Sequence, residues 1–464
     1  MPSRDNSSFV VVANRLPVKR VKRGKSQTWV TSPGGLVSAL KPILETRDGA
    51  WVGWTGSPGR APNRFKHDGI LNFPIAISRQ EIDEYYEGFS NRTLWPLYHD
   101  AIRPPTFHRT WWRTYVNVNK RFAELTADVA AQDATVWVQD YHLQLVPRML
   151  REQRPDLKIG FFLHIPFPPE ELFAQIPWRA QVLEGLLGSD VVGFQTKIAA
   201  DNFVRLAKRF TSWSGSGGAV NVDKRRVVAR DFPISIDYER FRDLALDDEN
   251  RLKGLSFRQR LGQRRKIILG VDRLDYTKGI EIRLRAYREL LETERVKPDE
   301  VVFVQIAVPS RETVTEYADT RANIERLVGE INGEYADVGR PAVHYLRQSF
   351  PQDELVALYT AADVMLVTPL CDGMNLVAKE YVAARTNNTG VLVLSEFTGS
   401  ARELGGALLV NPHDIDGLVL TIDRALHMPD NEQERRITSM RKQIAKHDVY
   451  HWAETFLEAM AKHK

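Results

Sequence analysis

Cationic side chains suited to binding phosphate occur at three places along the sequence. Arg15 follows one short apolar run, Arg273 and Lys278 follow a second, and Arg311 follows a third. A guanidinium group can bind phosphate through two parallel hydrogen bonds, whereas a lysine ammonium acts as a point charge. These residue types indicate a ligand that carries phosphate groups.

Backbone N–H groups could add to this phosphate chemistry. Gly34 and Gly35 would let main-chain amides approach a diphosphate without a Cβ in the way, although a plain turn explains the pair equally well. One helical pattern opens after Gly279 and another at Asn375 and Leu376. Helix N-termini carry partial positive charge and favour anions.

Two carboxylates have a spacing that suits a sugar or ribose. Asp372 lies in a DGMN loop, and Glu380 lies about one turn into the helix that follows. Each carboxylate can accept two hydrogen bonds from hydroxyl groups, but an ordinary acidic helix N-terminus would read the same way. His164, in HIPFPPEE, fits either a structural hydrogen bond or an acid–base role. Cys371 has no evident partner base, so we interpret it as a packing residue.

Aromatic residues concentrate in the first quarter of the chain. The group consists of Trp54, Tyr85, Tyr86, Phe89 and Trp95. Sugar rings present C–H faces that stack on such side chains, but aromatic clusters are equally common in cores. The sequence leaves both interpretations open.

The elements that must position these residues are buried parallel strands. Continuous apolar runs of strand length begin at Phe9, Thr135, Ile159, Asp190, Lys266, Val301, Asp363 and Val391. Helical patterns at 143–151, 280–292, 353–362 and 376–384 lie between them. This alternation predicts an α/β fold in which ligands bind beyond the carboxyl ends of the strands. The polar residues that follow the runs are Asn14, Arg15, Asp140, His164, Gln195, Asp272, Arg273, Ser310, Arg311 and Asp372.

Composition narrows the class of protein. The chain has 464 residues, which is enough for two domains, and its single cysteine excludes an intrachain disulfide or a cysteine-cluster metal site. The N-terminal apolar stretch is too short for a signal sequence, and no run approaches a membrane span of about 18 residues. We therefore expect a cytoplasmic protein that does not bind a membrane. A domain boundary is predicted near Pro233, after the glycine-rich segment 212–219.

The net charge of +5 raises the question of nucleic-acid binding. The densest basic cluster comprises Lys19, Arg20, Lys22, Arg23 and Lys25. We interpret it as a solvated loop, and we expect no nucleic-acid partner because the other notable cations stand at strand ends.

Several segments together resemble the trehalose-6-phosphate synthase family of retaining glycosyltransferases. They are NRLPV at Asn14, GGL at Gly34, YYEGFSNRTLWP at Tyr85, QDYHL at Gln139, FFLHIPFP at Phe161, GFQT at Gly193, VDRLDYTKG at Val271, PSR at Pro309, INGEY at Ile331 and TPLCDGMNLVAKEYVA at Thr368. The matches extend over nearly the whole chain.

The resemblance implies a role for each matching residue. Glucose 6-phosphate would contact Arg15, Tyr86, Asp140 and Arg311, in a pocket lined by Trp95 and Ile165. A nucleotide sugar would contact Gly34, Gly35, Trp54, Arg273, Lys278, Phe350, Asp372, Asn375, Leu376, Val377, Ala378, Lys379 and Glu380. The resemblance implies four catalytic residues. Asp372 and His164 would contact the transferred glucose, and Arg273 and Lys278 would stabilise the charge on the leaving diphosphate.

The fold implied is glycosyltransferase-B: two doubly wound, Rossmann-like parallel-sheet domains facing a cleft. Residues 1–233 would bind the acceptor and residues 234–446 the nucleotide sugar, with a C-terminal helix at about 447–464 packing back on the first domain. The reaction implied is glucose transfer from UDP-glucose, or ADP- or GDP-glucose, to glucose 6-phosphate without a metal or cofactor. We also expect a homo-oligomer.

Two departures from the family pattern are visible. Gln139 stands where many members have histidine, and Ser349 precedes Phe350 where some have histidine, which leaves the choice of base open. Alternative hypotheses are a pseudo-glycosyltransferase that joins cyclitols and a non-catalytic sugar-phosphate sensor. A sensor could lose donor residues, and this chain retains them.

Overall fold

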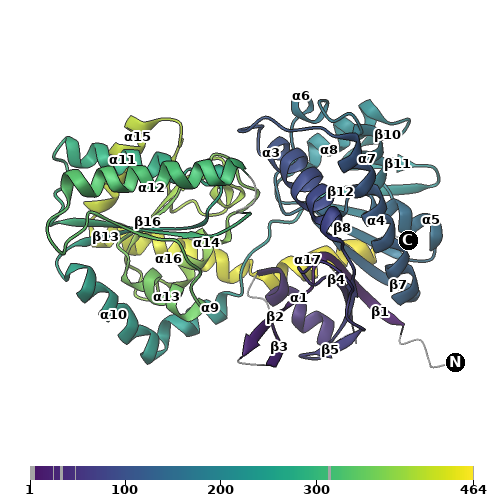
Figure 1. Cartoon of the computed structure of the whole chain (residues 1–464), viewed down its shortest axis with the longest axis horizontal. Helices are drawn as coiled ribbons and strands as arrows, with labels where there is room; N and C mark the ends of the chain where they lie inside the picture. The colour runs from purple at the N-terminus through teal and green to yellow at the C-terminus, as the bar shows by residue number, and fades with distance from the viewer. Residues whose placement is uncertain (1–5, 24–25, 32–34, 47–48, 312–314, 463–464) are drawn as a thin grey trace. The chain divides into compact units, whose positions relative to one another are not determined.

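The computed structural model describes residues 6–23, 26–31, 35–46, 49–311 and 315–462. The chain forms two compact units (Figure 1). Unit 1 comprises Met1–Ile234 with Tyr450–Lys464, and unit 2 comprises Ser235–Val449. Each unit is an α/β structure built on its own sheet.

Unit 1 contains one large sheet and a small hairpin. Its strands are β1 (Ser7–Arg15), β2 (Val18–Arg23), β3 (Ser26–Thr31), β4 (Ala50–Trp54), β5 (Phe65–His67), β6 (Ile70–Ile75), β7 (Ala130–Gln139), β8 (Lys158–Phe162), β9 (Val191–Phe194), β10 (Ser214–Ser216), β11 (Ala219–Val222) and β12 (Arg225–Asp231). Its helices are α1 (Gly35–Thr46), α2 (Arg79–Glu81), the π-helix η1 (Ile82–Leu94), α3 (Trp95–Tyr98), α4 (Arg109–Val129), the 3₁₀ turn η2 (Tyr141–Leu143), α5 (Val146–Gln153), α6 (Glu170–Phe173), α7 (Arg179–Leu186), α8 (Lys197–Phe210) and, but for its first residue, α17 (Val449–Ala461).

The large sheet of unit 1 is doubly wound. Its order is β10-β11-β12-β9-β8-β7-β1-β4-β6-β5, and the seven strands from β12 to β6 are parallel. Antiparallel strands extend both edges, because tight turns join β5 to β6 and β10 to β11. The winding reverses between β1 and β7, so the residues after these two strands lie at the topological switch point.

The C-terminal helix α17 packs on this sheet. The Trp452 and Phe456 rings lie 5.0 and 4.4 Å from the Trp137 ring on β7. Gly193 on β9 permits the approach, since a Cβ there would lie 2.6 Å from the Phe456 ring. Aromatic packing thus ties the end of the chain to unit 1.

Unit 2 has a six-stranded sheet whose strands all run parallel. They are β13 (Lys266–Arg273), β14 (Val301–Val308), β15 (Val343–Leu346), β16 (Val364–Val367), β17 (Val391–Ser395) and β18 (Leu408–Val410). The other elements are α9 (Tyr238–Leu246), α10 (Asp248–Gly262), the 3₁₀ turn η3 (Tyr276–Lys278), α11 (Ile280–Glu292), α12 (Thr315–Tyr335), α13 (Gln352–Ala361), α14 (Leu376–Ala384), the 3₁₀ turn η4 (Gly399–Arg402), α15 (Ile415–Leu426) and α16 (Asp430–Lys446).

The order β15-β14-β13-β16-β17-β18 is the doubly wound order 3-2-1-4-5-6, so β13 and β16 flank the switch point. Along β13, Ile268 packs with α11, α12 and α15, whereas Ile267 and Leu269 pack with α9, α13, α14 and α16 on the other face (Figure 1). Burial on both faces explains why the predicted strands are continuously apolar. The predicted apolar runs all lie in strands, which confirms the α/β fold with parallel sheets.

One interpretation of the sequence is wrong. The basic cluster does not form a loop: Lys19, Arg20, Lys22 and Arg23 lie on β2, which pairs with β3 as an antiparallel hairpin, and Lys25 lies outside the described residues. The stacked rings of Trp29 and Phe65, 4.5 Å apart, and the Arg20 guanidinium over Trp29 support the hairpin. None of these distant contacts is visible in the local sequence.

Candidate functional site

In unit 1 the exposed Arg15 side chain extends from the end of β1 at the switch point. Its guanidinium carbon lies 4.0 Å from the Trp54 ring centroid and 5.4 Å from that of Tyr86. Gly56, at φ +91°, leaves room for it, because a Cβ at this position would collide with Nη1. Rings and a glycine therefore orient a cation that an anion can reach.

The aromatic group divides between core and surface. Tyr85 is fully buried and donates its hydroxyl proton to Asn14 Oδ1 at 2.9 Å. Trp54 and Trp95 are also buried, at 2% and 4% exposure, and Trp54 Nε1 donates to the Ser57 carbonyl. Tyr86 is partly exposed on the π-helix η1. Trp54, predicted to bind the donor, thus lies under Arg15, which was predicted to bind the acceptor.

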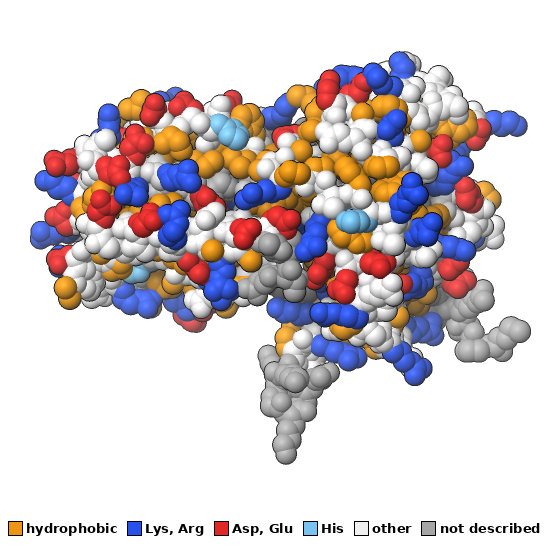
Figure 2. Space-filling model, turned by 45° about the horizontal axis from the view of Figure 1, so that its top comes forward, with side chains coloured by type: hydrophobic (Ala, Val, Ile, Leu, Met, Phe, Trp, Pro, Cys, Tyr) orange, Lys and Arg blue, Asp and Glu red, His pale blue; other side chains and the backbone are white. Residues whose placement is uncertain are grey.

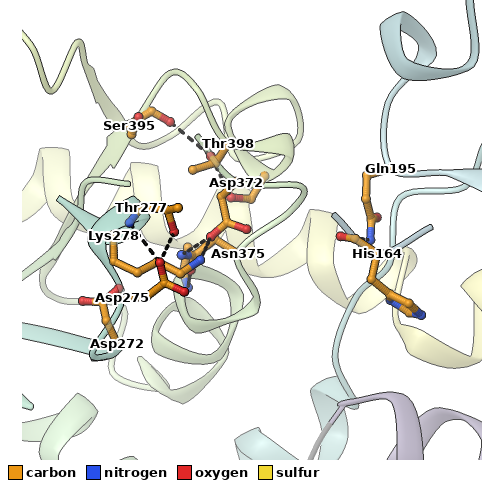
Figure 3. Close-up of polar contacts among 12 residues, drawn as sticks. His164, Gln195, Asp272, Asp275, Thr277, Lys278, Asp372, Asn375, Ser395 and Thr398 are labelled. Carbon is orange, nitrogen blue, oxygen red and sulfur yellow. Dashed lines mark hydrogen bonds and ion pairs between the residues drawn. The ribbon is translucent and has the colours of Figure 1, made fainter. Parts of the chain in front are cut away.

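Asp140 and His164 follow the neighbouring strands β7 and β8. Asp140, at φ +74°, accepts a hydrogen bond from the His164 backbone N–H at 3.1 Å. His164 Nε2 lies 2.9 Å from Gln139 Oε1, and the backbone carbonyl of His164 accepts from Gln195 Nε2 at 3.3 Å (Figure 3). The buried Ile165 comes next in the chain.

These contacts define the chemistry of His164. Desolvation lowers its pKa to about 3, so the imidazole is neutral near pH 7. The Gln139 amide oxygen can only accept, so this contact is a hydrogen bond in the tautomer that carries the ring proton on Nε2. No role was predicted for Gln139, which ends β7, or for Gln195, which was named only as one of the polar residues that follow the apolar runs.

In unit 2 the side chains of Lys278 and Asp372 meet at the switch point. Lys278 Nζ lies 2.6 Å from Asp372 Oδ2, and Asn375 Nδ2 donates to the same oxygen at 3.1 Å (Figure 3). The two charged side chains are 9% and 15% exposed. Gly279, at φ +63°, lets the η3 turn approach β16, because a Cβ there would collide with the Thr368 carbonyl.

Two arginines of the same unit were also predicted to bind phosphate groups. Arg273 ends β13 with an exposed side chain. Arg311 Nη1 donates to the Tyr317 hydroxyl at 2.6 Å and lies 3.9 Å from Asp275 Oδ2. Arg311 thus lies in unit 2, whereas the other residues predicted to contact glucose 6-phosphate lie in unit 1.

Helix α14 presents its N-terminus in the same unit. Asn375 caps it at φ +73°, with its side chain accepting from the Ala378 backbone N–H at 3.2 Å. Leu376 and Val377 in the first turn are partly exposed. The Lys379 ammonium forms a buried ion pair with Glu403 at 2.7 Å. Because its side chain is engaged in this pair, the backbone of Lys379 is the part of the residue suited to contact a ligand.

Glu380 and Phe350 complete the residues predicted for the donor. Glu380 accepts from the Tyr359 hydroxyl at 2.9 Å, and desolvation raises its pKa to about 6. Phe350 is partly buried between β15 and α13. Gly34 lies outside the described residues, and Gly35 is the first residue of α1.

The described residues contain no group of three His, Cys, Asp or Glu side chains that could hold a metal ion. Likewise, no described helix is long and apolar enough to cross a membrane.

On the face of unit 2 in Figure 2, basic and acidic side chains alternate rather than forming a basic stripe. Cys371 is buried.

Comparison with known proteins identifies relatives along the whole chain. The model of glycosyltransferase family 20 matches residues 7–462. A trehalose-6-phosphate synthase of Mycobacterium sp. (strain KMS) is 55% identical over 467 residues, covering 98% of this chain and 95% of the relative.

Solved structures are similar over the same length. The UDP-forming α,α-trehalose-phosphate synthase of Burkholderia xenovorans in complex with glucose 6-phosphate is 34% identical, with a TM-score of 0.89, covering 98% of this chain and 99% of that one. A trehalose-6-phosphate synthase analysed with bisubstrate glycomimetics, in a study of glycosyl transfer with retention, is 36% identical with a TM-score of 0.89 and the same coverage.

Proposed function

Because the chain belongs to glycosyltransferase family 20, we propose that it transfers glucose from a nucleotide diphosphate glucose to glucose 6-phosphate. The product is α,α-trehalose 6-phosphate, and the anomeric configuration is retained. The observation that supports the proposal is the Lys278–Asp372 pair at a switch point, where Lys278 Nζ lies 2.6 Å from Asp372 Oδ2. A lysine cation suits a phosphate, and a carboxylate suits sugar hydroxyls. The names of the similar proteins favour this reaction over a cyclitol-joining or sensing role.

The donor site that we propose lies in unit 2. Arg273 and Lys278 bind the diphosphate, helped by the N-terminus of α14, and Glu380 accepts hydrogen bonds from the ribose. Phe350 contacts the base through its backbone, and Asp372 binds glucose hydroxyls. UDP-glucose is the proposed donor, since the Burkholderia xenovorans relative is UDP-forming.

The acceptor site that we propose consists of Arg15, Tyr86 and Asp140 in unit 1. Arg311, the other arginine predicted to contact glucose 6-phosphate, lies in unit 2. Arginines are needed because both substrates are anionic, and their charges repel each other when close. Arg15 offers a guanidinium fork for the phosphate, and Asp140 accepts from a sugar hydroxyl. Neutral His164 contacts the transferred glucose.

The proposed mechanism is a front-face displacement. As the diphosphate leaves, positive charge develops at the anomeric carbon, and the acceptor hydroxyl arrives on the same face. Arg273 and Lys278 stabilise the negative charge on the leaving group. A phosphate oxygen of that group takes the proton of the acceptor hydroxyl.

The test is product analysis. The protein is incubated with glucose 6-phosphate and, separately, with UDP-, ADP- and GDP-glucose, and products are identified by mass and NMR. We expect fastest turnover with UDP-glucose and an α,α-1,1-linked disaccharide phosphate. A β-linked glucose, or no transfer from any donor, would contradict the proposal.

We also propose that neither a metal nor a cofactor takes part, because cationic side chains stand where leaving-group charge develops. Activity should persist in EDTA, and strict dependence on added Mg²⁺ or Mn²⁺ would contradict this expectation. A cytoplasmic location and a homo-oligomeric state stay predictions, which cell fractionation and light scattering can test.

A further inference from the structure

The carboxylate of Asp275 in unit 2 is buried, and the charges of Arg311, Arg273 and Lys278 act on it. Asp275 lies between β13 and the η3 turn and is only 1% exposed. Its two oxygens have different partners, and each leads to a different cation. This division has consequences for how the two substrates are bound.

The first oxygen holds the turn that carries Lys278. Asp275 Oδ1 accepts from the Thr277 backbone N–H at 3.0 Å and from Thr277 Oγ1 at 2.9 Å (Figure 3). Thr277 is completely buried, so these hydrogen bonds are shielded from water. They fix the residue immediately before Lys278.

The second oxygen holds the side chain that contacts Arg311. The Tyr317 hydroxyl donates to Asp275 Oδ2 at 3.1 Å, and Arg311 Nη1 donates to the Tyr317 oxygen at 2.6 Å. Tyr317 is 2% exposed, and its ring packs edge-on against Tyr276 at 5.4 Å. A relay of two hydrogen bonds therefore connects Asp275 to the Arg311 guanidinium.

The electrostatics keep both connections intact. Burial acts to raise the pKa of Asp275, but the charges of Arg311, Arg273 and Lys278 outweigh it and hold the pKa below the usual value. Burial and the Asp275 charge raise the pKa of Tyr317 above its usual range. The carboxylate stays ionised as an acceptor, and the phenol stays protonated as a donor.

We propose that Asp275 is a positioning residue that orients Lys278 for the donor diphosphate through Thr277 and Arg311 for the acceptor phosphate through Tyr317. The inference rests on the proposed function, since it takes Lys278 and Arg311 as contacts of the two substrates. Asp275 itself contacts neither substrate. Each arm can therefore be cut separately.

The experiment measures kinetic constants and calorimetric affinities for Tyr317→Phe and Thr277→Val. We expect Tyr317→Phe to raise KM for glucose 6-phosphate about tenfold, to leave KM for free glucose unchanged and to leave UDP affinity unchanged. Thr277→Val should weaken UDP binding by a similar factor without changing the affinity for glucose 6-phosphate. Asp275→Asn should show both defects.

A matched control is Tyr287→Phe, which removes another buried hydroxyl of unit 2. Among the described residues, that hydroxyl bonds to the Val301 and Ala342 carbonyls at 3.2 Å. It should lower thermal stability without changing either affinity. If Tyr317→Phe behaves like this control while Arg311→Ala loses glucose 6-phosphate affinity, the positioning role is wrong.

The proposed function is tested independently. If wild-type protein binds both ligands but forms no trehalose 6-phosphate, the proposed reaction fails, whereas the calorimetric comparison of the two arms still tests the positioning role. If Asp275→Asn does not fold, Tyr317→Phe and Thr277→Val carry the test.

Discussion

Lys278 Nζ lies 2.6 Å from Asp372 Oδ2, although 94 positions separate the two residues in the chain. The ammonium that we assign to the donor diphosphate therefore already carries a carboxylate partner. A diphosphate must share Lys278 with Asp372, so the two residues should respond differently to substitution.

Lys278→Ala should weaken UDP binding about tenfold or more, because it removes a charged hydrogen-bond donor. Asp372→Asn should keep or increase UDP affinity, since it relieves the competition for the ammonium, but it should reduce turnover strongly. Calorimetry with UDP and a product assay measure the two effects. Equal loss of UDP affinity in both variants would mean that Asp372 itself helps to bind the nucleotide.

Arg15→Ala should weaken glucose 6-phosphate binding about tenfold to a hundredfold, the loss of roughly 1.5 to 3 kcal/mol for a hydrogen bond to a charged group. The preference for glucose 6-phosphate over glucose should fall, and UDP affinity should stay unchanged. Calorimetric titration with each ligand checks this. Arg79→Ala is the control, because Arg79 is 74% exposed and its pair with Asp83 is loose at 3.8 Å.

His164 should make stability depend on pH. Its pKa of about 3 in the folded protein lies below the ordinary 6.5, so unfolding takes up a proton between these values. The free energy of unfolding should thus be fully retained above about pH 6.5 and fall as the pH decreases towards 3. Denaturant unfolding across this range should give a shallower slope for His164→Asn.

The control for this measurement is His427→Asn, since His427 is 67% exposed. It should retain the wild-type slope. If His164→Asn also retains it, the low pKa assigned to His164 is wrong.

Gly193→Ala should destabilise the protein by about 1 to 3 kcal/mol, as is typical of overpacking. The new Cβ would lie 2.6 Å from Phe456 and 2.7 Å from Phe162. Gly329→Ala in α12 is the matched control, because beyond its chain neighbours and the backbone of its own helix no described atom would lie within 4 Å of a Cβ there. It should be neutral or stabilise by up to about 1 kcal/mol. The measurement is the free energy of unfolding in denaturant. Equal values for Gly193→Ala and Gly329→Ala would contradict the close packing of α17 on Gly193.

The sequence by itself predicted eight of the parallel strands and several of the helices that lie between them. The helices predicted at 280–292 and 376–384 have these bounds in α11 and α14, and each predicted apolar run lies in a parallel strand. Such strands are buried on both faces, so their continuous apolar pattern is a local signal. The polar residues that follow these apolar runs include Arg15, Asp140, Arg273 and Asp372.

Only the tertiary structure decided which of these residues meet. Tyr317 is 42 positions from Asp275, and no local pattern predicts their hydrogen bond. The π-helix at Ile82–Leu94 was likewise not predicted, and its Tyr85 hydroxyl donates to Asn14 on β1. A strand buried on both faces can be predicted from its own continuous apolar residues. A contact between distant side chains depends on how separate elements pack, so the local sequence does not predict it.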